Sequence, residues 1–216
     1  MRQISRLSVI AVSTALLITL SSCSSTQSTL EADDQPSTPI ENREMTSDVQ
    51  ENKANGDSPQ GSVTDAANFE ITENEDGTIT ISRYIGTETG IVIPPQIDGK
   101  TVSAIGNVTG TTGAFEGCTN ITAVVIPEGV TEIQDNAFYG CTSLETVTIP
   151  SSVTLLRNCA FCDCPNLRAV YFEGDAPQQA NYVFDSTENV TMYYQDGTSG
   201  WENPWHGRPA EVYIPE

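Results

Sequence analysis

The second half of the chain repeats itself every 23 residues, and this period constrains the fold more than any other feature. At each step an aromatic residue follows a small one. These pairs are Ala114-Phe115, Ala137-Phe138, Ala160-Phe161 and Val183-Phe184. A single unit of this length cannot bury its own apolar side, so successive units must stack as coils and share one core. We therefore expect a solenoid in which equivalent side chains lie above one another.

Further columns keep the same spacing. Three positions after each Phe stand Cys118, Cys141, Cys164 and then Thr187. The next apolar columns are Ile121, Leu144, Leu167 and Val190, followed by Val124, Val147, Val170 and Tyr193. Within one unit, the alternation of Val147 and Ile149 is typical of a short strand with one face inward. The pattern predicts a β-rich solenoid with a short parallel sheet on one wall and loops and turns on the opposite wall.

The ends of such a solenoid expose core and need caps. Phe69-x-Ile71 and Ile79-x-Ile81 flank Glu75-Asp76-Gly77, which predicts an N-terminal hairpin. Trp201 and Trp205 lie in a Gly- and Pro-rich tail, and we expect them to lie across the last coil. The predicted divisions of the folded part are a hairpin cap and first coil at 68–113, the repeats at 114–195 and a C-terminal cap at 196–216.

The N-terminal segment has the features of an export and anchoring sequence. Arg2 and Arg6 precede an apolar run that is too short for a typical membrane-spanning helix and predicts a signal peptide over 1–22. Leu20-Ser21-Ser22-Cys23 resembles the bacterial lipobox, and this resemblance implies that Cys23 is acylated and becomes the first mature residue. The alternative is a plain secretory signal with an incidental cysteine. Residues 23–67 are polar and acidic, which predicts a disordered tether.

Charge and composition argue against several classes of function. The chain carries 9 Lys and Arg against 29 Asp and Glu, and this formal net charge of -20 opposes binding to nucleic acid or to anionic lipid headgroups. His206 is the only histidine and no nucleophile motif is present, so we expect a surface residue and no enzyme. We expect no metal or other cofactor, and contact with a membrane only through the lipid anchor.

The cysteines of the repeats divide into two groups. Cys118, Cys141 and Cys164 share one column, and stacking at about 4.8 Å misses disulfide geometry, so we interpret them as buried small hydrophobic residues. Cys159 and Cys162 fall in columns that otherwise hold surface residues. Two exposed thiols three residues apart outside the cytoplasm are predicted to form a local disulfide. A zinc site is the weaker alternative, because a second Cys pair or a His pair is missing.

The unit from Ile126 to Pro150 resembles, almost position by position, the repeat of the BspA-like family of bacterial leucine-rich-repeat surface proteins. Ile93-Pro94 resembles the family's entry segment, and the stretch from Phe172 to Pro177 resembles its exit. The resemblance covers about 69–213 and implies a leucine-rich-repeat solenoid at the bacterial cell surface. It also implies adhesion to host or neighbouring-cell proteins, with host extracellular-matrix protein as one example.

The outward side of the predicted sheet is the candidate ligand-binding face. Val125, Thr146, Thr148 and Tyr171 alternate with inward residues, and Arg168 stands at the margin. An ordinary solvated sheet face is the competing interpretation. We expect a non-enzymatic module that binds a protein or peptide. It would be extracytoplasmic, lipid-anchored to the cell membrane or outer membrane, and would face outward. The alternative is a structural spacer or subunit of an envelope assembly without an exogenous ligand.

Overall fold

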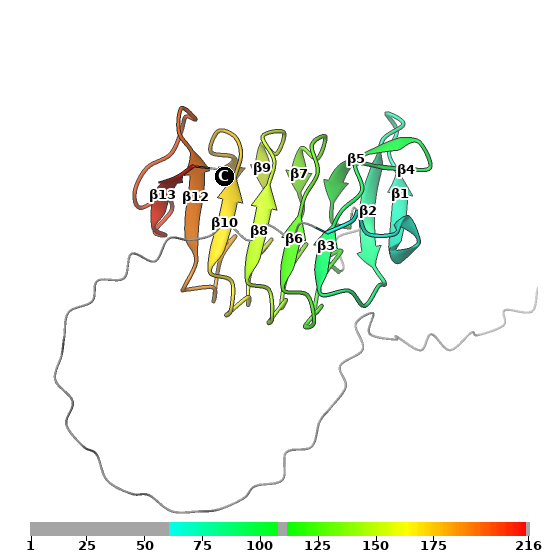
Figure 1. Ribbon diagram of the computed structural model, residues 1–216, viewed down its shortest axis with the longest axis horizontal. Coiled ribbons are helices and arrows are strands. Elements are labelled where there is room, and N and C mark those ends of the chain that lie inside the picture. Colours follow the sequence, from blue (N-terminus) through cyan, green and yellow to red (C-terminus); the bar gives the residue numbers. More distant parts are fainter. Residues whose placement is uncertain (1–60, 108–111, 215–216) are drawn as a thin grey trace, which may run out of the picture.

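The computed structural model describes residues 61–107 and 112–214. The predicted signal peptide over 1–22, Cys23 and the tether as far as residue 60 lie outside the described residues. The described chain winds as a solenoid of two β-sheets with one core between them, and Figure 1 shows the coils following one another along the long axis. The predicted β-rich solenoid is confirmed.

The strands are short and belong to two sheets, which we call sheet A and sheet B. Sheet A has the order β1-β2-β5-β7-β9-β11, with β4 beside β5. Its strands are β1 (Phe69–Glu73), β2 (Ile79–Tyr84), β4 (Gln96–Ile97), β5 (Lys100–Ile105), β7 (Glu132–Ile133), β9 (Leu155–Leu156) and β11 (Gln178–Gln179). Sheet B has the order β13-β12-β10-β8-β6-β3. Its strands are β3 (Gly90–Val92), β6 (Ala123–Val125), β8 (Thr146–Ile149), β10 (Ala169–Phe172), β12 (Thr191–Gln195) and β13 (Ala210–Tyr213). A 3-10 helix, η1 (Ala66–Asn68), precedes β1.

Sheet A is the part of the fold that the repeat pattern did not reveal. We expected loops and turns opposite the predicted sheet, whereas β7, β9 and β11 pair in parallel on that wall. Each of these strands has only two residues, which is too few for an alternation of apolar and polar residues to be recognised in the sequence. The Ala-Phe turns follow them in each coil.

Parallel pairing in sheet B brings the repeat columns into register. Val124, Val147 and Val170 are partners across β6, β8 and β10 and are fully buried. The 23-residue spacing predicted that Tyr193 would be the partner of Val170 in β12. The partner is instead Met192. The reason is that the stretch between Phe184 and this position of β12 is one residue shorter than the equivalent stretch of the preceding unit. Because successive side chains alternate between faces, this slip turns Met192 into the core and Tyr193 outward.

The aromatic column forms a continuous stack through the core. Ring centroids lie 4.8 Å apart between Phe115 and Phe138, 5.1 Å between Phe138 and Phe161, and 5.4 Å between Phe161 and Phe184. Tyr84 of β2 extends the stack, 5.2 Å from Phe115. All five rings are buried. The straight stack confirms the inference that equivalent side chains of successive coils lie above one another.

The column three residues after each Phe packs in the core and also forms a ladder of hydrogen bonds between successive coils, made by Cys141, Cys164 and Thr187. Cys141 Sγ donates to the carbonyl oxygen of Phe115 at 3.1 Å, and Cys164 Sγ donates to that of Phe138 at 3.1 Å. Thr187 makes the equivalent bond with its hydroxyl. Burial raises the pKa of Cys164 to about 12, so this thiol keeps the proton that it donates. Burial of these residues was predicted, but their role as donors was not.

The N-terminal cap contains the predicted hairpin, because β1 and β2 pair antiparallel. Ordered contacts begin before residue 68, where we expected the tether to end. Thr64 is buried, its N–H donates to the carbonyl oxygen of Val92 at 2.9 Å, and its hydroxyl accepts from the N–H of Val92 at 3.1 Å. These bonds cover the outer edge of β3, which a solenoid must protect from unwanted strand pairing.

The C-terminal cap combines a further strand with two indole rings. β13 pairs in parallel with β12, so sheet B gains a strand that no repeat signature marks. The Trp201 ring lies 4.8 Å from that of Phe172, and the buried Trp205 ring lies 5.6 Å from it. Both tryptophans therefore pack against the end of the core, as predicted.

Candidate recognition face

The outward face of sheet B carries the residues that the sequence singled out. Val125, Thr148 and Tyr171 are partners across β6, β8 and β10 and form one row. Thr146 lies in the neighbouring row, opposite Ala169. Val125, Thr146 and Thr148 are half-buried, whereas Tyr171 is only 9% exposed. The structure thus brings four of the predicted site residues together on one face.

Three tyrosines meet at the C-terminal end of this row, and we call Tyr171, Tyr193 and Tyr213 the tyrosine cluster. Tyr171 stacks on Tyr193 with ring centroids 5.2 Å apart and meets Tyr213 edge-on at 5.3 Å. These two contacts cover Tyr171 although it points outward from its strand. Gln195 Nε2 donates to the hydroxyl of Tyr213 at 3.4 Å. Burial raises the pKa of both Tyr171 and Tyr213, so these hydroxyls remain donors at neutral pH.

Sequence reasoning missed two members of the cluster. The 23-residue count placed Tyr193 in the inward column, and Tyr213 lies in β13, outside the repeats. Alternation within β12 is compatible with either face for Tyr193, and only its pairing with Tyr171 decides between them.

Arg168 stands at the margin of the face, as predicted, and makes an ion pair. Its guanidinium contacts the carboxylate of Glu145 in the preceding coil, and the two side chains are 66% and 46% exposed. An exposed pair of this kind contributes at most about 1 kcal/mol, so a ligand can displace it at little cost. Arg168 therefore suits the rim of an interface.

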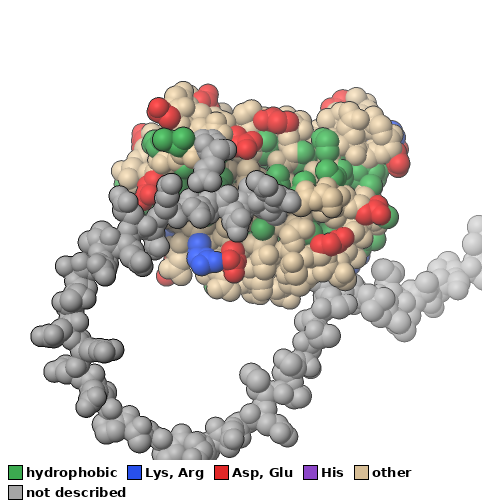
Figure 2. All heavy atoms as spheres, in the orientation of Figure 1, with side chains coloured by type: hydrophobic (Ala, Val, Ile, Leu, Met, Phe, Trp, Pro, Cys, Tyr) green, Lys and Arg blue, Asp and Glu red, His purple; other side chains and the backbone are tan. Residues whose placement is uncertain are grey.

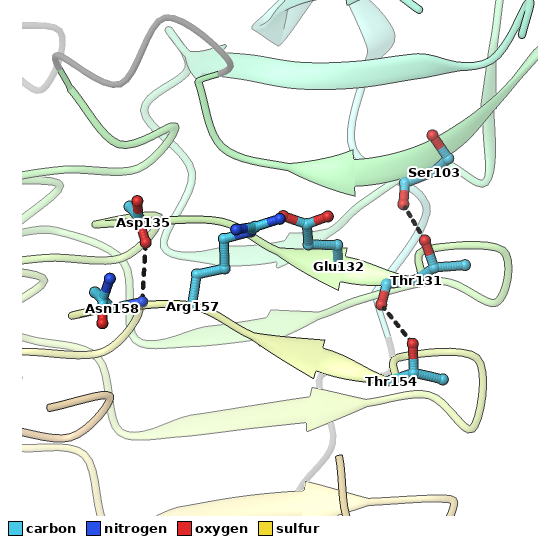
Figure 3. A network of polar contacts seen from close by, with 7 residues as sticks. All are labelled: Ser103, Thr131, Glu132, Asp135, Thr154, Arg157 and Asn158. Carbon is cyan, nitrogen blue, oxygen red and sulfur yellow. Dashed lines mark hydrogen bonds and ion pairs between the residues drawn. The ribbon is translucent and has the colours of Figure 1, made fainter. Parts of the chain in front are cut away.

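The outward face of sheet A is different, because several of its polar groups already pair with one another (Figure 3). Figure 3 shows contacts that join adjacent coils: Arg157 with Glu132, Asn158 with Asp135, Thr131 with Ser103 and Thr154 with Thr131. The Asn158 N–H donates to Asp135 at 2.9 Å. Groups that are satisfied in this way have little to offer a ligand, so sheet B presents the better candidate face.

Charge limits the partner. Figure 2 shows acidic side chains spread over the visible face and fewer basic ones, in agreement with the net charge of -20. At the end of β10, burial and, to a smaller extent, the charge of Glu128 raise the pKa of Glu173, so a further carboxylate placed there would be disfavoured. A ligand surface with basic or uncharged residues therefore fits better than an acidic one.

Cys162, one of the two cysteines expected at the surface, is buried. Cys159 is half-buried, but Cys162 is only 2% exposed, so the prediction of two exposed thiols was wrong. The small Cys162 side chain turns toward the next coil and its Sγ donates to the carbonyl oxygen of Tyr182 at 2.8 Å, whereas the larger Tyr139 in the same column reaches solvent. Burial raises the pKa of Cys162. Both thiols are free in the structure, and the local disulfide stays a prediction.

His206 is exposed, as expected, with its ring 5.0 Å from that of Trp205. It lines a pocket of about 260 Å³ at the C-terminal end of the solenoid, together with Gln179, Tyr182 and Arg208. Across residues 61–107 and 112–214, no three His, Cys, Asp or Glu side chains gather as metal ligands would. The described part of the chain also contains no helix with the length and apolar character needed to span a membrane.

Comparison with known families identifies the repeats. Residues 109–198 match the family described as BspA type leucine-rich repeat region, in six copies. This region consists of BspA-type leucine-rich repeats. Leucine-rich repeats of this kind indicate a protein-recognition or binding module and are typically not enzymes, and BspA-like proteins are commonly bacterial cell-surface proteins. No curated protein matches the chain.

Solved bacterial leucine-rich-repeat structures share the fold. A leucine-rich-repeat protein of T. pallidum is 22% identical with a TM-score of 0.52, over 72% of this chain and 84% of that one. A leucine-rich cell surface protein of Faecalibacterium prausnitzii A2-165 is 28% identical with a TM-score of 0.51, over 72% of this chain but only 43% of that one. A leucine-rich-repeat protein of Bacteroides capillosus ATCC 29799 is 25% identical with a TM-score of 0.50, over 61% and 99%.

Proposed function

We propose that this BspA-type protein is a surface-anchored, non-enzymatic adhesion module that binds a protein ligand through the outward face of sheet B. The observation that carries the proposal is the continuous row from Val125 through Thr148 to the tyrosine cluster. Tyrosine side chains offer a large contact area at a low entropic cost, together with a polar hydroxyl. Neighbouring strands are about 4.8 Å apart, so the row suits a short segment of a partner rather than a large surface.

We further propose that acylation of Cys23 holds the protein outside the cytoplasm and that the tether extends it from the membrane. The lipobox resemblance of Leu20-Ser21-Ser22-Cys23 supports this anchor. Two or more acyl chains anchor a protein stably, whereas one chain gives only reversible binding. Expression in a bacterium that processes lipoproteins should place the protein in the membrane fraction with an acylated N-terminal Cys23 by mass spectrometry. A Cys23→Ser variant that partitions in the same way would refute the anchor.

Ligand binding is tested on immobilised extracellular-matrix proteins and on whole cells. We expect the double variant Tyr193→Ala, Tyr213→Ala to bind at least about ten-fold more weakly than the wild type, because it removes the exposed part of the cluster. Tyr139→Ala is the matched control, since Tyr139 is 36% exposed and lies away from sheet B. Equal binding by the double variant and the wild type would overturn the assignment of this face.

A negative result on all surfaces has its own interpretation. If no matrix protein or cell binds, and one envelope protein co-purifies in a fixed ratio, the protein is a structural subunit of an envelope assembly instead. That outcome would replace the adhesion proposal.

A further inference from the structure

Two exposed carboxylates flank the tyrosine cluster on the outward face of sheet B. Glu211 of β13 is the partner of Tyr193 of β12 and therefore shares its outward direction. Glu173 follows directly after β10, and its N–H donates to the carbonyl oxygen of Ile149 at 3.0 Å, which continues the pairing of that strand. Because side chains alternate along a strand, Glu173 points to the same side as Tyr171. Both carboxylates are exposed, so a ligand can reach them.

Neither carboxylate is satisfied by the protein itself. Within the described part of the chain, the side chains of Glu173 and Glu211 make no hydrogen bond and no ion pair. Glu128, by contrast, accepts from the hydroxyl of Ser151 at 2.8 Å. Burial and, to a smaller extent, the charge of Glu128 raise the pKa of Glu173, as expected for a carboxylate without a nearby cation. The charge of Glu173 also adds to the effect of burial in raising the pKa of Tyr213.

The three strands that carry this part of the face contain no basic residue. Neither Lys nor Arg occurs in β10, β12 or β13. Arg168 precedes β10, at the opposite end of that strand from Glu173, and contacts Glu145. Arg208 precedes β13 and donates to the carbonyl oxygen of Phe184 at 2.9 Å. The positive charge that complements these carboxylates would therefore have to come from a partner.

Arginine suits a site that combines carboxylates with tyrosine rings. A guanidinium forms paired hydrogen bonds with a carboxylate and stacks on an aromatic ring, whereas an ammonium is a more strongly hydrated point charge. Tyr193 and Tyr213 are half-buried, so part of each side chain is open to a ligand. The strand register places Glu173 and Glu211 two strands and two residues apart, which corresponds to about 12 Å between their Cα atoms. One guanidinium cannot contact both carboxylates across this distance.

We propose that this part of the face binds an extended basic segment of the partner protein that carries two arginines four positions apart. Side chains at positions i and i+4 of an extended segment point to the same side and lie about 13 Å apart, which matches the spacing of the two carboxylates. One guanidinium contacts Glu173 and the ring of Tyr213, and the other contacts Glu211 and the ring of Tyr193. This inference rests on the proposed function and specifies the chemistry of its ligand.

Three peptides test the charge and the spacing. The first, acetyl-Arg-Ala-Gln-Ala-Arg-amide, has its arginines four positions apart. The second, acetyl-Ala-Arg-Gln-Arg-Ala-amide, has the same composition and charge, but its arginines are two positions apart. The third replaces both arginines of the first by citrulline, which keeps the shape of the side chain and removes its charge.

Binding to the whole protein is followed by nitrogen-15 NMR. We expect the first peptide to bind with a Kd of about 1 mM and to shift the signals of Tyr193, Gln195 and Tyr213. The second peptide should bind several-fold more weakly, and the citrulline peptide at least about ten-fold more weakly. Equal binding of the first peptide and either of the others would overturn the proposal.

Glu173→Gln and Glu211→Gln test the two carboxylates. Each substitution keeps the size of the side chain and removes one charge, and we expect each to weaken binding of the first peptide about five-fold. Glu75→Gln is the matched control, because it removes the same charge from an exposed residue in the turn between β1 and β2, at the other end of the solenoid (Figure 1). An equal effect of Glu75→Gln would reduce the interaction to a general attraction by the net charge of -20 and would also overturn the proposal.

This inference and the proposed function fail in different ways on matrix proteins and cells. The inference is wrong if the Tyr193→Ala, Tyr213→Ala variant loses binding to these surfaces while a Glu173→Gln, Glu211→Gln variant binds like the wild type. If the first peptide binds with the expected spacing and carboxylate dependence, but the tyrosine variant still binds the surfaces, the arginine site stands and the adhesion face lies elsewhere.

Discussion

Thr187 Oγ1 donates a 2.7 Å hydrogen bond to the carbonyl oxygen of Phe161 in the preceding coil and accepts a 3.0 Å bond from the N–H of Cys164. Thr187→Val keeps the shape of the side chain and removes both bonds, leaving two buried groups unpaired. We expect a loss of about 2–4 kcal/mol in the free energy of unfolding. Thr187→Ser keeps the hydroxyl and should cost about 1 kcal/mol. Urea unfolding distinguishes the two, and equal stability of the Ser and Val variants would contradict a role for the ladder.

The stack of phenylalanines makes a second prediction about stability. Phe138 contacts rings on both sides, so Phe138→Ala should leave a cavity and lower the free energy of unfolding by about 3–5 kcal/mol. The next residue provides the control, because the exposed Tyr139→Ala should change it by about 0.5 kcal/mol or less. Thermal unfolding followed by circular dichroism measures both. A small effect of Phe138→Ala would mean that neighbouring coils close the gap.

The hydroxyl of Tyr84 donates to the carboxylate of Glu88, and this pair predicts a pH dependence. Burial and the Glu88 bond raise the pKa of Tyr84 above its ordinary 10.0, so its stabilisation is complete below pH 10 and is lost at more alkaline pH. The bond lowers the pKa of Glu88 below 4.5, so the contribution of Glu88 is present above pH 4.5 and is lost as the pH falls through the folded value.

Tyr84→Phe keeps the ring in the stack and removes this bond, together with the 3.1 Å bond that the Glu88 N–H donates to the Tyr84 hydroxyl. We expect it to cost about 1 kcal/mol at neutral pH, since Glu88 is exposed. The difference from the wild type should shrink in acid. Urea unfolding at several pH values measures it, and a difference that is constant between pH 3 and pH 7 would exclude the carboxylate of Glu88 as the group responsible.

Cys159 and Cys162 are predicted to form a local disulfide in an oxidising environment. Alkylation without reduction, followed by peptide mass spectrometry, should find this pair linked and Cys141 and Cys164 modified only after unfolding. The bond must break the contact between Cys162 and the carbonyl oxygen of Tyr182, and the loop it closes is short, so the gain in stability should be small. Recovery of both residues as alkylated thiols from native, oxidised protein would refute the disulfide.

The repeat period was sufficient to predict the solenoid, because every 23-residue step adds the same small set of buried side chains. It failed where the spacing changes. One residue fewer before β12 moved Tyr193 to the outside, and only the pairing with Tyr171 reveals this. The donor role of Cys141 and Cys164 was not predictable from residue type, because a thiol packs as well as a small apolar group and bonds only if a carbonyl lies within reach.

Backbone conformation explains another gap in the sequence reading. Gly117, Gly140, Asp163 and Ser186 occupy one column, and all four adopt a positive φ, from 53° to 70°. Glycine adopts this conformation without strain, but Asp163 and Ser186 do so at a cost that the fold must offset. A search for glycines therefore finds this turn only in the first two of these coils, whereas the 23-residue spacing locates it in all four.

Every interior coil offers its successor the same ring, the same carbonyl and the same strand edge that it receives from its predecessor. The codons for a segment such as 137–159 can therefore be duplicated or deleted, and the coils on either side would still meet through the same contacts. Each added copy lengthens the body by about 4.8 Å and contributes one more row of outward side chains. Recombination between repeat units can thus change the length and the side chains of the outward surface of the solenoid while the buried core stays unchanged.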